Sequence, residues 1–166
     1  MPLIALFLAR MSRVSYTNRL PDVAFFMGAT FFVAPVTEVV LNAGYKAVTG
    51  HFLWQYHTLP IGEGSTSWVA VVIWPSYALY TYLLHHLLKQ HLSGGRFLLV
   101  EGALSGVKAL ALEALFNGVF LVLYGIYVAY YLPGDLWHLT SVQVYPFYVL
   151  AGFAQWAVLT NMRIQR

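Results

Sequence analysis

The sequence predicts an all-α polytopic membrane protein, a bundle of four transmembrane helices. Of its 166 residues, 60% are hydrophobic and only 9% are charged, against about 25% charged residues in soluble domains. Four apolar segments also reach the roughly 20 residues that cross a hydrocarbon core. Aromatic residues make up 17% of the chain, which is typical of bilayer-interface belts.

The four expected spans are residues 23–45, residues 67–88, a part of residues 97–131, and residues 142–159. Before them, an apolar run is followed by arginines, the reverse of the order in a signal peptide. We therefore expect residues 1–22 to form an interfacial segment that the mature protein retains, with a mitochondrial presequence as the alternative. Residues 23–166 are expected to form a single transmembrane domain.

Orientation follows from the distribution of lysine and arginine, which are enriched in cytoplasmic loops. On one side of the expected bundle lie Arg10, Arg13, Arg19, Lys89, Arg96, Arg163 and Arg166. Only Lys46 lies on the other side. Both termini are thus expected in the cytoplasm, or in the matrix or stroma of an organelle.

Two carboxylates interrupt apolar segments. Glu38 lies one helical turn before Asn42 in the first span, and Glu113 lies one turn before Asn117 in the third. Carboxylates at this depth normally face a bundle interior, a polar partner or a cavity. The pattern predicts a polar centre inside the bundle, with the two glutamates as candidate catalytic acids. We expect Asn42, Asn117, Tyr77, Tyr148 and Trp156 to be ligand-binding residues.

The order of motifs suggests an internal repeat. A Glu-x-x-x-Asn unit, a Leu-Trp pair, a Thr-Ser pair and an aromatic-Pro pair follow one another twice. This order predicts a tandem duplication of a two-span hairpin, a 2+2 helix repeat, in which Pro75 would match Pro146. The spacings are unequal, so chance similarity in an aromatic-rich chain is the alternative.

The sequence contains few signals of thiol, metal or other site chemistry. The chain has no cysteine, which excludes disulfides, thiol chemistry and iron–sulfur clusters. The histidines, including His85 and His86, fall near expected span ends and are interpreted as interfacial, so no metal and no cofactor is predicted. Lys108 is expected to pair with Glu101 or Glu113, and the Gly-x-x-x-Gly pattern after Glu101 predicts close helix packing. Nothing indicates binding to nucleic acid.

One stretch resembles the emopamil-binding sterol isomerases. The resemblance lies in Ile73-Trp74-Pro75, in Leu87 to His91, and in Arg96 to Leu99. It implies a sterol-like ligand, with Gln155-Trp156 at the place where that family has an Asn and a Trp near its ligand. The second span has no Glu at the place of that family's catalytic acid.

Two further resemblances involve the first loop. The spacing from Glu38 to Trp54-Gln55-Tyr56-His57 is similar to that of small four-helix membrane components attributed to ABC transporters. The run Leu53 to Tyr56, followed by Leu59 to Glu63, resembles the membrane lycopene cyclases without their paired acids. Two of the three families handle isoprenoid or sterol ligands with an intramembrane acid.

Two functions are therefore compatible with the sequence. In the first, the polar centre binds an apolar isoprenoid- or sterol-like lipid, and in a catalytic version isomerises or cyclises it by protonating a double bond. In the second, the chain is a non-catalytic accessory subunit of a larger membrane complex, such as a respiratory or photosynthetic one. Its buried polar groups would then hold helices and partner subunits together.

Overall fold

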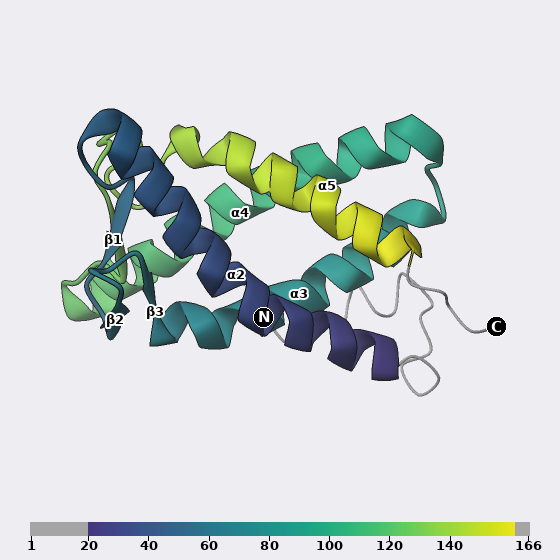
Figure 1. The fold of residues 1–166 in the computed structure, drawn as a ribbon, viewed down its shortest axis with the longest axis horizontal. Coiled ribbons are helices and arrows are strands. Elements are labelled where there is room, and N and C mark those ends of the chain that lie inside the picture. The colour runs from purple at the N-terminus through teal and green to yellow at the C-terminus, as the bar shows by residue number, and fades with distance from the viewer. Residues whose placement is uncertain (1–19, 162–166) are drawn as a thin grey trace.

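The computed structural model describes residues 20–161, so residues 1–19 of the expected interfacial segment lie outside the described part. Four long helices are joined by two small sheets (Figure 1). The elements are α2 (Leu20–Thr49), β1 (Trp54–Tyr56), β2 (Pro60–Ile61), β3 (Thr66–Ser67), α3 (Trp68–Lys89), α4 (Gly94–Tyr124), β4 (Ala129–Tyr131), the short 3-10 helix η1 (Val142–Val144) and α5 (Tyr145–Asn161). The predicted all-α class is confirmed, with four very short strands that the sequence did not predict.

Three of the helical segments are long and apolar enough to cross a membrane, namely α2, α4 and the continuous stretch Val142–Asn161. The fourth expected span, α3, has 22 residues but is not among them. Its composition explains this, because Thr81, His85 and His86 are buried inside the protein. A central helix can place polar groups against its neighbours, and these groups lower its mean hydropathy.

The helices are arranged as two hairpins. α2 packs mainly against α3, and α4 packs mainly against α5. The strands and the loops that carry them gather at one end of the bundle, on the left in Figure 1, away from the turn between α3 and α4. Each loop therefore lies over the end of the helix pair that it connects, within reach of residues in the outer half of the bundle.

The two loops meet through a symmetric strand pair. β1 and β4 are antiparallel, with Gln55 opposite Tyr130 at the centre of the register. Beyond the strands, His57 N donates to Val128 O over 3.0 Å, and Leu132 N donates to Leu53 O over 3.1 Å. These two bonds exchange under a two-fold rotation about the centre of the pair.

The predicted close packing at the glycines of α4 is confirmed. A Cβ atom at Gly102 would lie 2.1 Å from the Phe153 ring, and one at Gly106 would lie 2.4 Å from the Tyr145 ring. On the facing helix, a Cβ at Gly152 would lie 2.6 Å from Ser105. Small residues on both helices thus let α4 and α5 approach closely.

The predicted match of the two prolines is wrong. Pro75 is the eighth residue of α3, whereas Pro146 is the second residue of α5. Pro146 falls in the first turn, where its missing N–H has no helical partner to lose. Pro35 lies inside α2, as expected.

Candidate functional site

Glu38 is a buried carboxylate held by the loop that follows its own helix. It is 7% exposed. Tyr56 Oη donates to one carboxylate oxygen over 2.8 Å, and Thr66 Oγ1 donates to the other. The Trp74 side chain also hydrogen-bonds this group. Glu38 therefore fastens β1, β3 and the start of α3 to the middle of α2.

Glu113 is held in the same way in the second half of the chain. Thr140 Oγ1 donates to one carboxylate oxygen over 2.6 Å, and the Tyr148 hydroxyl donates to the other. The Tyr131 side chain is the third hydrogen-bonding partner. Each glutamate thus receives a threonine, a strand tyrosine and an aromatic side chain from the next helix.

The two asparagines hold the loops at their other ends. Asn42 Nδ2 donates to Trp54 O over 2.8 Å, and Asn42 Oδ1 accepts from Leu53 N over 2.9 Å. Asn117 binds Ala129 O over 2.9 Å and Val128 N over 3.1 Å in the same manner. The partners lie 12 and 11 residues away in both cases. We expected the asparagines to lie beside the glutamates as ligand-binding groups, and the structure instead pairs them with backbone.

Together these contacts form two clasps, each made of a glutamate, an asparagine and the strand loop between them. The second clasp follows the first by 75 residues from Glu38 to Glu113, and by 74 residues from Thr66 to Thr140. The clasps adjoin where the Trp74 and Tyr148 rings lie 6.4 Å apart between centroids. The polar centre therefore has two matching halves.

Beside Glu38 there is a groove between α2 and α5, which make little direct contact with one another. Its volume is about 410 Å³. The lining is mostly apolar and runs along α2 from Phe26 to Leu41, with Glu38 near one end and Gln155 on the α5 side. We refer to it as the α2–α5 groove.

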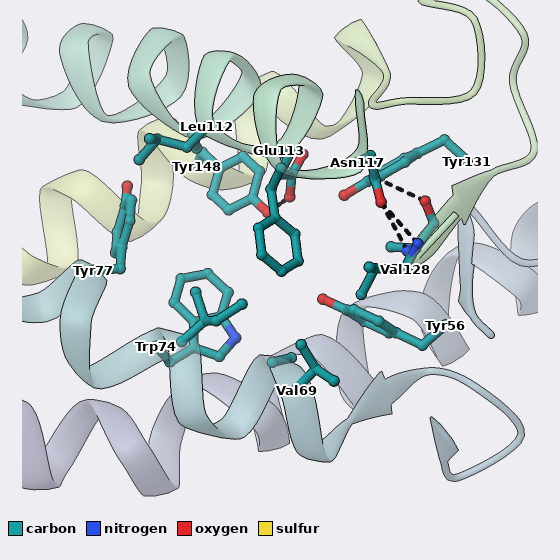
Figure 2. A pocket seen from close by; sticks show the side chains of 15 residues that line it. Tyr56, Val69, Trp74, Tyr77, Leu112, Glu113, Asn117, Val128, Tyr131 and Tyr148 are labelled. Carbon is teal, nitrogen blue, oxygen red and sulfur yellow. Dashed lines mark hydrogen bonds between the residues drawn. The ribbon is translucent and has the colours of Figure 1, made fainter. Parts of the chain in front are cut away.

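Beside Glu113 there is a second and smaller groove, between α3 and α4, of about 120 Å³. Figure 2 shows Glu113 on one side of it, with Trp74 across the groove and Tyr56, Tyr131 and Tyr148 around it. We refer to it as the α3–α4 groove. The two grooves lie between the first and fourth helices and between the second and third.

A separate polar cluster lies deeper between α3 and α4. His85, fully buried, places Nδ1 2.9 Å from a carboxylate oxygen of Glu101, which is 1% exposed. Lys108 Nζ donates to Thr81 Oγ1 over 2.9 Å. Among residues 20–161, Lys108 does not form the expected ion pair with either glutamate. His85 and His86 lie near the end of α3, as expected, and both are buried within the protein.

The remaining predicted residues are placed as follows. Tyr148 contacts Glu113 and lines both grooves, and Tyr77 lines the α3–α4 groove without contacting either glutamate. Trp156 lines neither groove and packs edge-on against Phe97. Among residues 20–161, no group of three or more His, Asp or Glu side chains is arranged to hold a metal ion.

The strand tyrosines were missed by sequence reasoning. Burial raises the pKa of Tyr56 well above its usual value, and the nearby Glu38 raises it further. Burial raises the pKa of Tyr131 in the same way, with Glu113 as the next cause. Both hydroxyls therefore remain protonated donors. The only signal in the sequence was their position after each Glu-x-x-x-Asn unit. The loops that carry them show no alternation of apolar and polar residues that would predict strands.

Comparisons of the chain with protein-family models, curated proteins and solved structures found no match.

Proposed function

We propose that this protein is an integral membrane protein of four spanning helices that binds an apolar isoprenoid- or sterol-like lipid in the α2–α5 groove. The observation that carries the proposal is the groove itself, an apolar space of about 410 Å³ that ends at Glu38. A ligand site is typically a mostly apolar cavity of about 300–1,000 Å³ with a few placed polar groups.

Binding is a better-supported role than catalysis. A catalytic acid must give up a proton, while both oxygens of Glu38 already accept hydrogen bonds from Tyr56 and Thr66. Glu38 in this arrangement shapes the end of the groove and fixes the loop above it. An isomerase or cyclase would have to open this clasp before Glu38 could reach a double bond.

Membrane orientation and ancestry belong to the same proposal. The strand loops lie on the lysine-poor side, and the turn between α3 and α4, which is flanked by Lys89 and Arg96, lies on the cytoplasmic side. The chain is a tandem duplication of a helix–strand–helix hairpin. The matching clasps support this, because chance would have to reproduce the Glu, Asn, Thr and Tyr contacts together.

The test blocks the groove. Ala151 lines it from α5, so Ala151→Phe fills part of the space. Ala111→Phe adds the same side chain at an exposed position of α4 outside both grooves. We expect wild type and Ala111→Phe to bind tritiated farnesyl methyl ether in detergent, and Ala151→Phe to bind it at least tenfold more weakly.

Equal binding by wild type and Ala151→Phe would contradict the proposal. So would an absence of binding to wild type, accompanied by recovery of the chain from native membranes only within a complex of fixed stoichiometry. That second result would instead support the accessory-subunit function.

A further inference from the structure

The outer ends of the two grooves are lined by residues at matching positions of the two halves of the chain. The α2–α5 groove uses Ala34, Thr37, Glu38 and Leu41, and the α3–α4 groove uses Ala109, Leu112, Glu113 and Phe116, each 75 residues later. On the other walls, Val144, Phe147, Tyr148 and Ala151 match Ala70, Ile73, Trp74 and Tyr77, each 74 residues apart. The same numbering offsets relate the two clasps, so the comparison can be extended inward.

The inner ends of the two grooves differ. Beside the α3–α4 groove, Lys108 Nζ donates to Thr81 and lies 4.8 Å and 5.1 Å from the ring centroids of Tyr77 and Tyr80. The lining of this groove ends at Tyr77 on α3 and at Ala109 on α4, next to these side chains. The matching positions beside the α2–α5 groove are Val33, Gln155, Ala151 and Ala154, all of which line it. Replacing two tyrosines and a lysine by small side chains explains why this groove is the larger one.

Gln155 lines the enlarged groove, and its side-chain oxygen, which is enclosed by the protein, lacks a partner. Gln155 Oε1 is buried and accepts no hydrogen bond from any residue of the described part of the chain. At the matching position beside the α3–α4 groove, the Thr81 hydroxyl accepts a hydrogen bond from the Lys108 ammonium. A buried acceptor without a donor is costly. Gln155 Oε1 therefore lacks the donor that Lys108 supplies to Thr81.

We propose that the occupant of the α2–α5 groove is a neutral lipid alcohol whose hydroxyl donates to Gln155 Oε1, with its apolar body extending outward to Glu38. This inference rests on the proposed function and names the ligand class for the same groove. Along α2 the lining extends from Phe26 to Leu41, about 22 Å at 1.5 Å per residue. Among residues 20–161, Glu38 is the only charged side chain in the lining, which favours a neutral ligand over an anionic one.

The first experiment compares farnesol with farnesyl methyl ether, which lacks the donor. Wild type should bind farnesol about threefold to tenfold more tightly, the range expected for one hydrogen bond within a membrane protein. Gln155→Leu should remove this preference by weakening farnesol alone, and Gln155→Glu should retain it. Competition with dioleoylglycerol, a lipid alcohol with acyl chains, distinguishes an isoprenoid source from a glycerolipid source.

The second experiment supplies the donor from the protein. Val33→Lys places an ammonium where the first half lacks one, so it should bond Gln155 and reduce farnesol binding at least tenfold. Val36→Lys is the matched control, because Val36 is exposed on the same helix and does not line the groove. Thermal unfolding of both variants shows that each is folded.

The two proposals fail separately. If the ether binds wild type as tightly as farnesol, or if Gln155→Leu weakens both probes equally, the lipid-alcohol inference is wrong while the groove remains a binding site. If Ala151→Phe leaves both probes bound, the groove assignment itself is wrong.

Discussion

At the residue scale, Glu38 and Glu113 act as anchors for loops. Glu38 satisfies the hydroxyls of Tyr56 and Thr66, and Asn42 satisfies backbone groups of Leu53 and Trp54. Without the clasp these donors and acceptors would lose their partners inside the protein, where an unpaired polar group is costly. The clasp therefore explains the position of polar residues in apolar helices without any reaction.

The clasp predicts different effects for two substitutions of Glu38. Glu38→Leu leaves the hydroxyls of Tyr56 and Thr66 without their acceptor, and should lower the free energy of unfolding by about 2–4 kcal/mol. Glu38→Gln keeps one carbonyl acceptor and should cost roughly half as much. Thermal unfolding in detergent measures both. Equal stability of wild type and Glu38→Leu would contradict the anchoring role.

The strand tyrosines predict a loss of stability at alkaline pH. Because burial raises the folded-state pKa of Tyr56 and Tyr131, their neutral forms stabilise the fold below the unfolded-state pKa of about 10. Above pH 10 the unfolded chain ionises first, and each tyrosine lowers the free energy of unfolding by about 1.4 kcal/mol per pH unit.

Urea titrations from pH 9 to pH 11 measure this slope. The double variant Tyr56→Phe, Tyr131→Phe should show a slope shallower by as much as about 2.7 kcal/mol per pH unit. Tyr124→Phe, at an exposed position of α4, is the control and should leave the slope as in wild type. An unchanged slope in the double variant would show that these hydroxyls ionise together with the others.

The sequence predicted which helical residues are exceptional, but not what they bind. A carboxylate and an amide one turn apart in an apolar helix predict a shared buried face. Their partners lie 11 to 28 residues away in loops whose strands are two or three residues long. Such strands carry too few residues to establish a period of two. The pairing of His85 with Glu101 was not predicted, because a position near a helix end does not reveal which side chain covers it.

At the element scale, the sequence predicted the helices and the close packing at the glycines of α4. It did not predict which helices lie next to one another. Apolar runs placed α2, α3 and α5 within four residues of their observed limits, whereas the run 97–131 set no limits for α4 and also contains β4. The repeated aromatic-Pro pair misled the comparison of α3 with α5, since the 3-10 helix η1 precedes α5 alone. Hydrogen bonds to the glutamates provide the correct register, and they become visible only in three dimensions.

Close packing between α4 and α5 predicts that an added methyl group destabilises the protein at Gly152 but not at Gly118. A Cβ at Gly152 would lie 2.6 Å from Ser105 and 3.0 Å from the backbone of Gly102, so Gly152→Ala must separate the helices. We expect a cost of about 1–3 kcal/mol. Gly118→Ala has nothing within 4 Å and should be neutral or stabilising by as much as about 1 kcal/mol. Chemical denaturation of both variants measures the difference, and equal effects would contradict the packing.

At the scale of the whole molecule, the pseudo-symmetric arrangement separates a common scaffold from a specialised groove. Both halves of the chain repeat the clasp, while only the α2–α5 groove is wide. This difference follows from three exchanges, of Lys108 with Val33, of Tyr77 with Ala151 and of Tyr80 with Ala154. Function in this interpretation belongs to the residues that break the symmetry.

The arrangement also predicts how the chain is inserted. Both strand loops lie at one end of the bundle and the α3–α4 turn at the other, so they should face opposite sides of the membrane (Figure 1). The chain has no cysteine, so a single cysteine at His57, His91 or Asp135, all exposed, gives an unambiguous label. A membrane-impermeant maleimide added to sealed right-side-out vesicles should label His57→Cys and Asp135→Cys. It should reach His91→Cys only after the vesicles are opened. Labelling of His57→Cys and Asp135→Cys from opposite sides would contradict both the spanning arrangement and the pairing of β1 with β4.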